Sequence, residues 1–131
     1  MTVRVRTITV DCADWVPLVE FWSRATRYRE DPSNPNNPGD PAGGLVDPDG
    51  GPALLFIPVP EGKTVKNRVH LDVEPDTTRD EEVARLLDLG ATVVGDHRRP
   101  DGTGWVTMAD PEGNEFCVER SSAEKAASPA T

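Results

Sequence analysis

A four-residue turn motif occurs twice in this chain, and the spacing of its copies constrains the fold more than any other feature. The sequence DPDG at residues 47–50 returns 63 residues later as DPEG at residues 110–113. The same spacing places residues 3–10 over residues 66–73, two stretches with the alternating pattern of a β-strand. A module repeated within one chain predicts two similar halves related by a pseudo-twofold axis.

The first half predicts a strand, a helix and further strands. Residues 3–10 form the first strand, and Asp14 caps a helix of about a dozen residues with one apolar stripe. The segment 31–44 is rich in Pro, Asn, Asp and Gly, so it is predicted to be a mobile loop. Two more strands are expected around 44–46 and 53–59.

The second half repeats this order. Thr78 and Glu81 form a capping-box pair at the start of the second helix, and Gly90 stands where a helix ends. The predicted strands are 67–73, 91–94, 104–109 and 115–120.

Each half is therefore interpreted as a β-α-β-β-β module, which gives an α+β fold. The two modules, residues 1–60 and 66–120, would form a single domain over residues 1–120. The tail 121–131 is rich in Ser, Ala and Pro and has nothing to bury, so we predict that it is disordered.

The chain is acidic, and its composition argues against several partners. Of its 131 residues, 23 are Asp or Glu and 14 are Lys or Arg, so the net charge is −9. This charge repels nucleic acid; it would concentrate a cationic ligand, or it serves solubility alone. No apolar run has the length of a membrane span or signal peptide, and Cys12 and Cys117 lack metal or redox spacing. We expect a cytoplasmic protein with reduced thiols and no membrane partner.

These features resemble the vicinal oxygen chelate superfamily, and within it the glyoxalase-like domains. The resemblance rests on the doubled module, on Phe21 seven residues after Asp14, and on the motifs KNRVHLD at 66–72 and DPEGNEFC at 110–117. It covers about residues 3–120 and implies a U-shaped mixed β-sheet around a cavity. Because the superfamily includes isomerases, dioxygenases, epimerases, thiol transferases and metal-free antibiotic-binding proteins, the resemblance is specific for the fold and weak for function.

The resemblance also implies where a divalent metal would bind. Its ligands would be a His on the first strand of each module and a Glu on the last strand of each. By motif and repeat, these places hold Thr7 and His70, Cys117, and a residue within 54–57. Two possible ligands are too few for Zn²⁺ or Fe²⁺, and a rebuilt site with Glu119 would still lack a third. We therefore predict no metal there and no cofactor.

Strand alternation gives two strands a polar face. Arg68, His70 and Asp72 share one face of the first, and Glu115, Cys117 and Glu119 share one face of the other. In the resembled architecture this face lines the cavity, and Trp105 would add an aromatic wall. The predicted ligand-binding residues are Thr7, Arg68, His70, Asp72, Trp105, Glu115 and Cys117.

Several of these features allow two interpretations. His70 acts as a general base or ligand contact, or it is a remnant satisfied by its strand neighbours. Cys117 is a nucleophile or a buried structural thiol. The basic segment 96–104 clamps an anionic group or is a solvated loop, and the loop 31–44 is a lid or is disordered.

Two functions follow from these residues. The first is a small-molecule-binding protein, similar to the bleomycin-resistance branch, that holds a small ligand in its cavity without the family's metal; the acidic charge would favour a cationic ligand. The alternative is a glyoxalase-like lyase, isomerase or dioxygenase that acts on a small oxygenated substrate, with His70 and Glu119 as acid and base. A purely structural role as a dimerisation module is less favoured. The resemblance further implies a homodimer.

Overall fold

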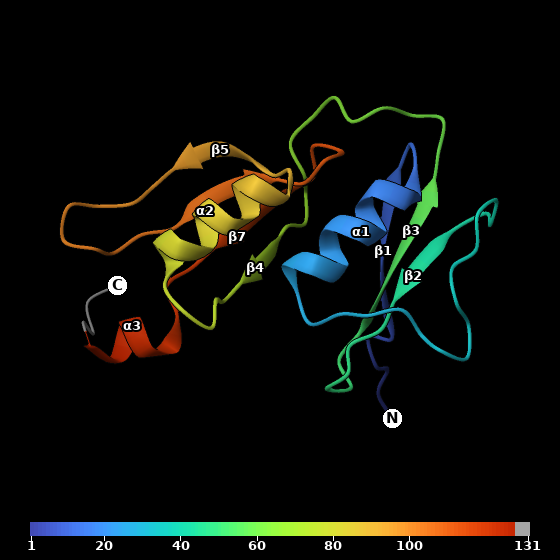
Figure 1. The fold of residues 1–131 in the computed structure, drawn as a ribbon, viewed down its shortest axis with the longest axis horizontal. Coiled ribbons are helices and arrows are strands. Elements are labelled where there is room, and N and C mark those ends of the chain that lie inside the picture. Colours follow the sequence, from blue (N-terminus) through green and yellow to red (C-terminus); the bar gives the residue numbers. More distant parts are fainter. Residues whose placement is uncertain (128–131) are drawn as a thin grey trace. The chain divides into compact units, whose positions relative to one another are not determined.

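The structure is a computed structural model, and it describes residues 1–127 (Figure 1). The chain separates into two compact units, one ending at Lys63 and the other beginning at Thr64. This boundary falls between the two modules that the repeat predicts.

The first unit has a three-stranded mixed sheet in the order β1-β3-β2. Strand β3 is central; it runs parallel to β1 and antiparallel to β2. The carboxylate of Asp14 accepts a hydrogen bond from the N–H of Val16 and so caps α1, and the buried residues of α1 pack against the sheet. The elements are β1 (Thr7–Cys12), α1 (Trp15–Ala25), β2 (Gly43–Leu45) and β3 (Ala53–Pro58).

The two strands expected at 44–46 and 53–59 form as β2 and β3, but the β-α-β-β-β pattern is incomplete because no third strand follows α1 in the first unit. In place of the missing strand is an isolated bridge between Arg29 and Val46. The equivalent residues of the second unit, 63 positions later, are Thr92 and Ala109. They also pair, and from this pair the ladder continues as β5 and β6. Pro32 follows Arg29 closely and has no N–H to donate, which explains why the first ladder stops.

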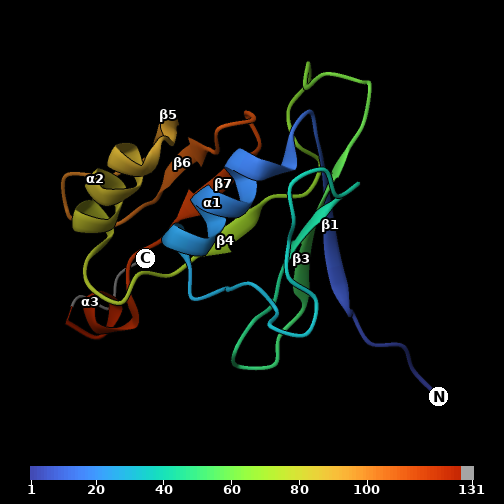
Figure 2. The same cartoon turned by 45° about the vertical axis from the view of Figure 1, so that its right-hand side comes forward.

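The second unit keeps the complete β-α-β-β-β order and adds a short helix. Its four-stranded mixed sheet has the order β4-β7-β6-β5; Figure 2 labels β6, which carries no label in Figure 1. Thr78 accepts a hydrogen bond from the N–H of Glu81, and Gly90 ends the helix with φ 113°. The elements are β4 (Leu71–Val73), α2 (Arg79–Leu89), β5 (Thr92–Asp96), β6 (Val106–Ala109), β7 (Glu115–Val118) and α3 (Ser122–Ala127).

Two further predictions for the second unit need correction. The strand predicted at 67–73 is shorter, because Asn67 is held by the side chain of Glu115 at 2.8 Å and β4 begins only at Leu71. The tail is not disordered from residue 121, since α3 forms there. Its start is stabilised because Glu124 accepts a hydrogen bond from the N–H of Ser121 at 2.9 Å. Residues 128–131 of the predicted tail lie outside the described part of the chain.

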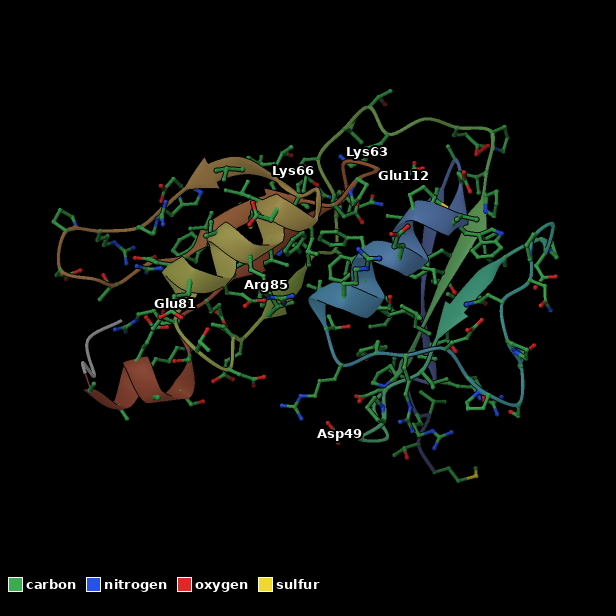
Figure 3. All side chains as sticks on the ribbon, viewed as in Figure 1. Asp49, Lys63, Lys66, Glu81, Arg85 and Glu112 are labelled. Carbon is green, nitrogen blue, oxygen red and sulfur yellow. The ribbon has the colours of Figure 1, made fainter. Side chains whose placement is uncertain are left out.

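The repeated motif forms a similar turn in both units. In each, the carboxylate of the first Asp, Asp47 or Asp110, accepts hydrogen bonds from two backbone N–H groups further along the turn. Figure 3 labels the third residue of each turn, Asp49 and Glu112. Asp49 also pairs with Arg27 at 3.3 Å, which ties the first turn to the chain just after α1.

Strand registers define which residues of the two units are equivalent. Ile8 pairs with Leu54 in the first unit, and Leu71 pairs with Phe116 in the second. The residues that precede Ile8 and Leu71, Thr7 and His70, are therefore equivalent, as the 63-residue spacing predicts. Past the turn the spacing falls to 62, because Leu45 pairs with Leu54 whereas Met108 pairs with Phe116. The first turn is one residue longer, which makes Leu55 the equivalent of Cys117.

Candidate functional site

Three side chains form a row across the polar face of the second sheet. Asp72 on β4 and Thr107 on β6 both pair in register with Cys117 on β7. The Thr107 hydroxyl lies 3.4 Å from the Cys117 sulfur. Alternation along β7 leaves Phe116 and Val118 for the opposite, core-forming face.

His70 stands at the edge of this row. Its Nδ1 lies 3.8 Å from the Cys117 sulfur and 3.5 Å from Asp72 Oδ1. The imidazole and the carboxylate are 40% and 54% exposed, whereas Cys117 is buried. Because both contacts use the same ring nitrogen, His70 cannot sit between Asp72 and Cys117 as the central member of a proton relay. The three donor atoms instead converge on one point.

The arrangement bears on metal binding. The four ligand positions that the resemblance implies are Thr7, Leu55, His70 and Cys117, and the first two carry no metal-binding group. Two of these four positions therefore lack the imidazole or carboxylate that the resemblance implies. A different set is present in the second unit, because the donor atoms of His70, Asp72 and Cys117 lie within 4.8 Å of one another.

Asp72 as a potential ligand was missed by the sequence analysis, which counted two donors. The signal was available, because Asp72 follows His70 by two residues on one strand face. What the sequence could not supply is the pairing of Asp72 with Cys117 across β4 and β7.

The other predicted residues of the second unit have different surroundings. Glu115 accepts a hydrogen bond from the N–H of Asn67, so it holds the segment before His70. Arg68 is exposed within that segment. Trp105 and Glu119 line a separate pocket of about 310 Å³, together with Arg99 and other basic side chains.

Thr7 lines a cavity of about 460 Å³ within the first unit. Leu55 also borders it, and the segment 31–44 supplies most of the remaining wall. Among the described residues, the charged side chains that line the cavity are Asp31 and Asp40, and no Lys, Arg or His lines it. Hydrogen bonds from the Ser33 hydroxyl and N–H lower the pKa of Asp31 below its usual value, so this carboxylate is ionised at neutral pH.

The segment 31–44 is anchored, although the sequence predicted a mobile loop. The side-chain amide of Asn36 exchanges two hydrogen bonds with the backbone of Gly44, each 2.9 Å long. The indole N–H of Trp15 donates to the carbonyl oxygen of Asp40 at 2.9 Å. These long-range bonds fix the wall of the cavity onto β2 and α1.

Comparison with known protein families identifies a family for this chain. The model of the glyoxalase-like domain matches residues 7–119. The chain belongs to the glyoxalase-like domain family. This assignment confirms the resemblance to the vicinal oxygen chelate superfamily, and no curated protein matches the sequence. In the part of this glyoxalase-like chain that the structure describes, no helix has the length and apolar character needed to cross a membrane.

Solved structures of low sequence identity share the fold. A glyoxalase/bleomycin resistance protein/dioxygenase family enzyme from Burkholderia phytofirmans PsJN is 19% identical, with a TM-score of 0.68 over 88% of this chain and 97% of its own. The fosfomycin resistance protein FosX from Mesorhizobium loti is 14% identical, with a TM-score of 0.67 and coverages of 97% and 99%. A lactoylglutathione lyase from Agrobacterium tumefaciens is 19% identical, with a TM-score of 0.60 and coverages of 90% and 93%. At these identities the similarity shows a common fold, while the names of these proteins indicate different activities.

Proposed function

We propose that this glyoxalase-like chain binds a small molecule and does not use the metal arrangement of its family. The observation that carries this proposal is the register of the two units. It places Thr7 where the second unit has His70, and Leu55 where it has Cys117. Half of the four ligand positions therefore hold a hydroxyl and an alkyl group, neither of which replaces imidazole or carboxylate.

The cavity of the first unit supports a small cationic ligand. Asp31 and Asp40 supply two negative charges to its lining, and no basic side chain in residues 1–127 lines the cavity to offset them. Thr7 adds a hydroxyl, and Leu54 and Leu55 add apolar surface. A pocket of this size with a few polar groups on an apolar wall is typical of small-molecule sites. The chemistry fits an ammonium group attached to a compact apolar body.

Benzylamine is expected to bind this cavity more tightly than benzyl alcohol or benzoate, which have a similar ring and a different charge. Replacing Asp31 and Asp40 by Asn, singly, should weaken benzylamine binding about threefold each, because ion pairs at partly exposed sites contribute about 0.2–1 kcal/mol. Both substitutions keep the side-chain oxygen that accepts local hydrogen bonds. Titration followed by amide chemical shifts in two-dimensional NMR measures affinity and location together.

Asp49→Asn is the matched control, since Asp49 lies on the turn 47–50, outside the cavity lining, and its loss changes net charge equally. If Asp49→Asn weakened benzylamine binding equally, the effect would come from the overall charge of the protein and not from this cavity. Equal affinity for the amine and the alcohol would contradict the proposal of a cationic ligand.

A second candidate function is a glyoxalase-like enzyme that uses His70 as acid or base on a small oxygenated substrate. The observation in its favour is the exposed imidazole beside the Asp72 carboxylate and the Cys117 thiol. The Asp72 carboxylate would stabilise the protonated imidazole of His70 during proton transfer. The sequence analysis proposed Glu119 as the second acid or base beside His70. In the structure Glu119 lines the pocket that contains Trp105.

Metal content tests the metal-free part of the first candidate. Two of the family's four ligand positions, Thr7 and Leu55, supply neither the imidazole nor the carboxylate that would hold the metal there. We therefore expect the purified protein to hold far less than one equivalent of divalent metal, and its thermal midpoint to stay within about 1 °C when EDTA is added.

Elemental analysis and melting curves with and without EDTA measure this. One equivalent of metal that is lost in Asp72→Asn, with a chelator-induced drop of several degrees in the wild-type midpoint, would contradict the metal-free proposal and make His70 a metal ligand. Asp76→Asn, an exposed acid on the same unit outside the cluster, controls for charge.

A further inference from the structure

The basic segment between β5 and β6 is a tightly built hairpin. The N–H of His97 donates to the carbonyl oxygen of Trp105, and the N–H of Arg99 donates to that of Thr103, both at 2.9 Å. Gly104 has φ 94°, and a Cβ there would collide with the carbonyl oxygen of His97. The hairpin therefore holds its side chains in defined places.

A buried arginine anchors this hairpin to α2. Arg79, the first residue of α2, is 4% exposed. Its Nη1 donates to the carbonyl oxygens of Gly102, Thr103 and Gly104, each at 3.1 Å. This guanidinium is buried and donates its hydrogen bonds to the protein itself, so it is not exposed to a ligand.

The second arginine of this region is also neutralised. Arg98 pairs with Asp96 at 2.7 Å and with Asp80 at 3.2 Å. Hydrogen bonds from Arg98 lower the pKa of Asp96 to about 2, so the pair remains ionised at all physiological pH values. Arg98 does not line the neighbouring pocket.

Arg99 differs from these two, because it faces a pocket. Its guanidinium carbon lies 5.8 Å from the ring centroid of Trp105, and it donates to the Thr103 hydroxyl at 3.3 Å. Within the described residues, no carboxylate lies within ion-pair distance of Arg99. Hydrogen bonds from Thr103 and, to a smaller extent, the charge of Arg99 lower the pKa of Asp101. The Trp105 ring, 37% exposed, also stacks with His97 at 4.7 Å between centroids.

We propose that this pocket, which we call the basic pocket, binds a small organic anion with a flat apolar part. Its volume is about 310 Å³, and its lining is Arg99, Gly104, Trp105, Glu119, Arg120 and Lys125. The lining carries three cationic side chains and one carboxylate, although the whole chain carries a net charge of −9. Arg120 is buried, so Arg99 and Lys125 are the cations exposed to a ligand. The guanidinium and ammonium groups attract a carboxylate or phosphonate, and the indole provides a flat wall for an attached planar group.

The proposal is independent of the cavity of the first unit. The two sites lie in different units and have opposite charge, so one ligand class should not substitute for the other. Failure of the basic pocket to bind an anion would leave the proposal for benzylamine untouched, and the reverse also holds.

Benzoate is the first probe, phenylphosphonate the second, and benzyl alcohol the neutral control, all titrated into the full chain at low ionic strength. Both anions should bind, and the alcohol at least tenfold more weakly. Arg99→Gln and Lys125→Gln should each weaken benzoate binding about three- to fivefold, and Glu119→Gln should tighten it about twofold. Added salt should weaken binding, because the charges are near the surface. Amide chemical shifts and Trp105 fluorescence report the site.

Arg98→Gln is the matched control, because it removes one positive charge next to the pocket from a side chain that does not line it. Its benzoate affinity should stay within about twofold of wild type. Equal weakening by Arg98→Gln and Arg99→Gln would overturn the proposal in favour of general electrostatic attraction. Equal binding of benzyl alcohol, or chemical-shift changes away from residues 97–105, would also overturn it. A preference between benzoate and phenylphosphonate would identify the anionic group.

Discussion

Replacing Arg79 by Met is expected to lower the free energy of unfolding of the second unit by about 3 kcal/mol. The substitution removes the Nη1 donor shared by three carbonyl oxygens and leaves these acceptors in a buried place. Methionine fills similar space, so the main loss is that of the charged hydrogen bonds and not of packing. Urea denaturation followed by circular dichroism measures the change.

Arg98→Met provides the comparison. Arg98 is partly exposed, and its ion pairs with Asp96 and Asp80 lie at the surface, so its loss should cost at most about 1 kcal/mol. If both variants lost the same free energy, the three bonds to the hairpin backbone would contribute little, and the rigidity of the basic pocket would need another cause. Arg79→Lys should recover part of the stability, since one ammonium can reach fewer of the carbonyl oxygens.

The helices of this chain could be predicted from local sequence because their ends are chemically marked. Asp14 and Thr78 both cap a helix as expected, and Gly90 ends the second with the left-handed conformation that glycine tolerates. The repeated motif predicted the place of each hairpin. These features depend on residues that are neighbours in the sequence, where side-chain chemistry and backbone conformation are directly linked.

Strand limits were less predictable because they depend on partners far along the chain. Arg29 forms one bridge and no strand, since Pro32 interrupts its ladder, although the equivalent segment in the second unit continues as β5. The α3 helix was missed because its stabilising contacts include a bond from the N–H of Arg79 to Glu124, a residue 45 positions later. An Ala- and Ser-rich tail gives no indication of such a partner.

The candidate sites show the same limit. Strand alternation put His70 and Cys117 on the polar faces of two different strands, and the structure brings His70 Nδ1 to 3.8 Å from the Cys117 sulfur. It did not identify the cavity of the first unit, where Asp31 and Asp40 come from a segment predicted to be mobile. It also assigned no difference between Arg98 and Arg99, because which of two adjacent arginines meets a carboxylate depends on the hairpin geometry.

Phe56→Ala is expected to destabilise the first unit by about 4 kcal/mol. Phe56 is completely buried on the central strand β3, and removing a buried phenyl ring loses its transfer free energy and leaves a cavity. Because whole domains are stable by only about 5–15 kcal/mol, the variant should unfold at much lower urea concentration. Trp15 and Trp22 are buried on α1, which packs against this sheet, so fluorescence can follow the transition.

Leu55→Ala tests the register behind the proposed function. Leu55 precedes Phe56 on the same strand, points to the opposite face and is only half-buried, so its loss should cost about 1 kcal/mol. A strand displaced by one residue would exchange the two faces, and Leu55→Ala would then be the more damaging change. That outcome would also remove Leu55 from the position equivalent to Cys117, and with it the argument that this position lacks a metal ligand. A large cost for Phe56 and a small one for Leu55 would support both the register and the metal-free interpretation.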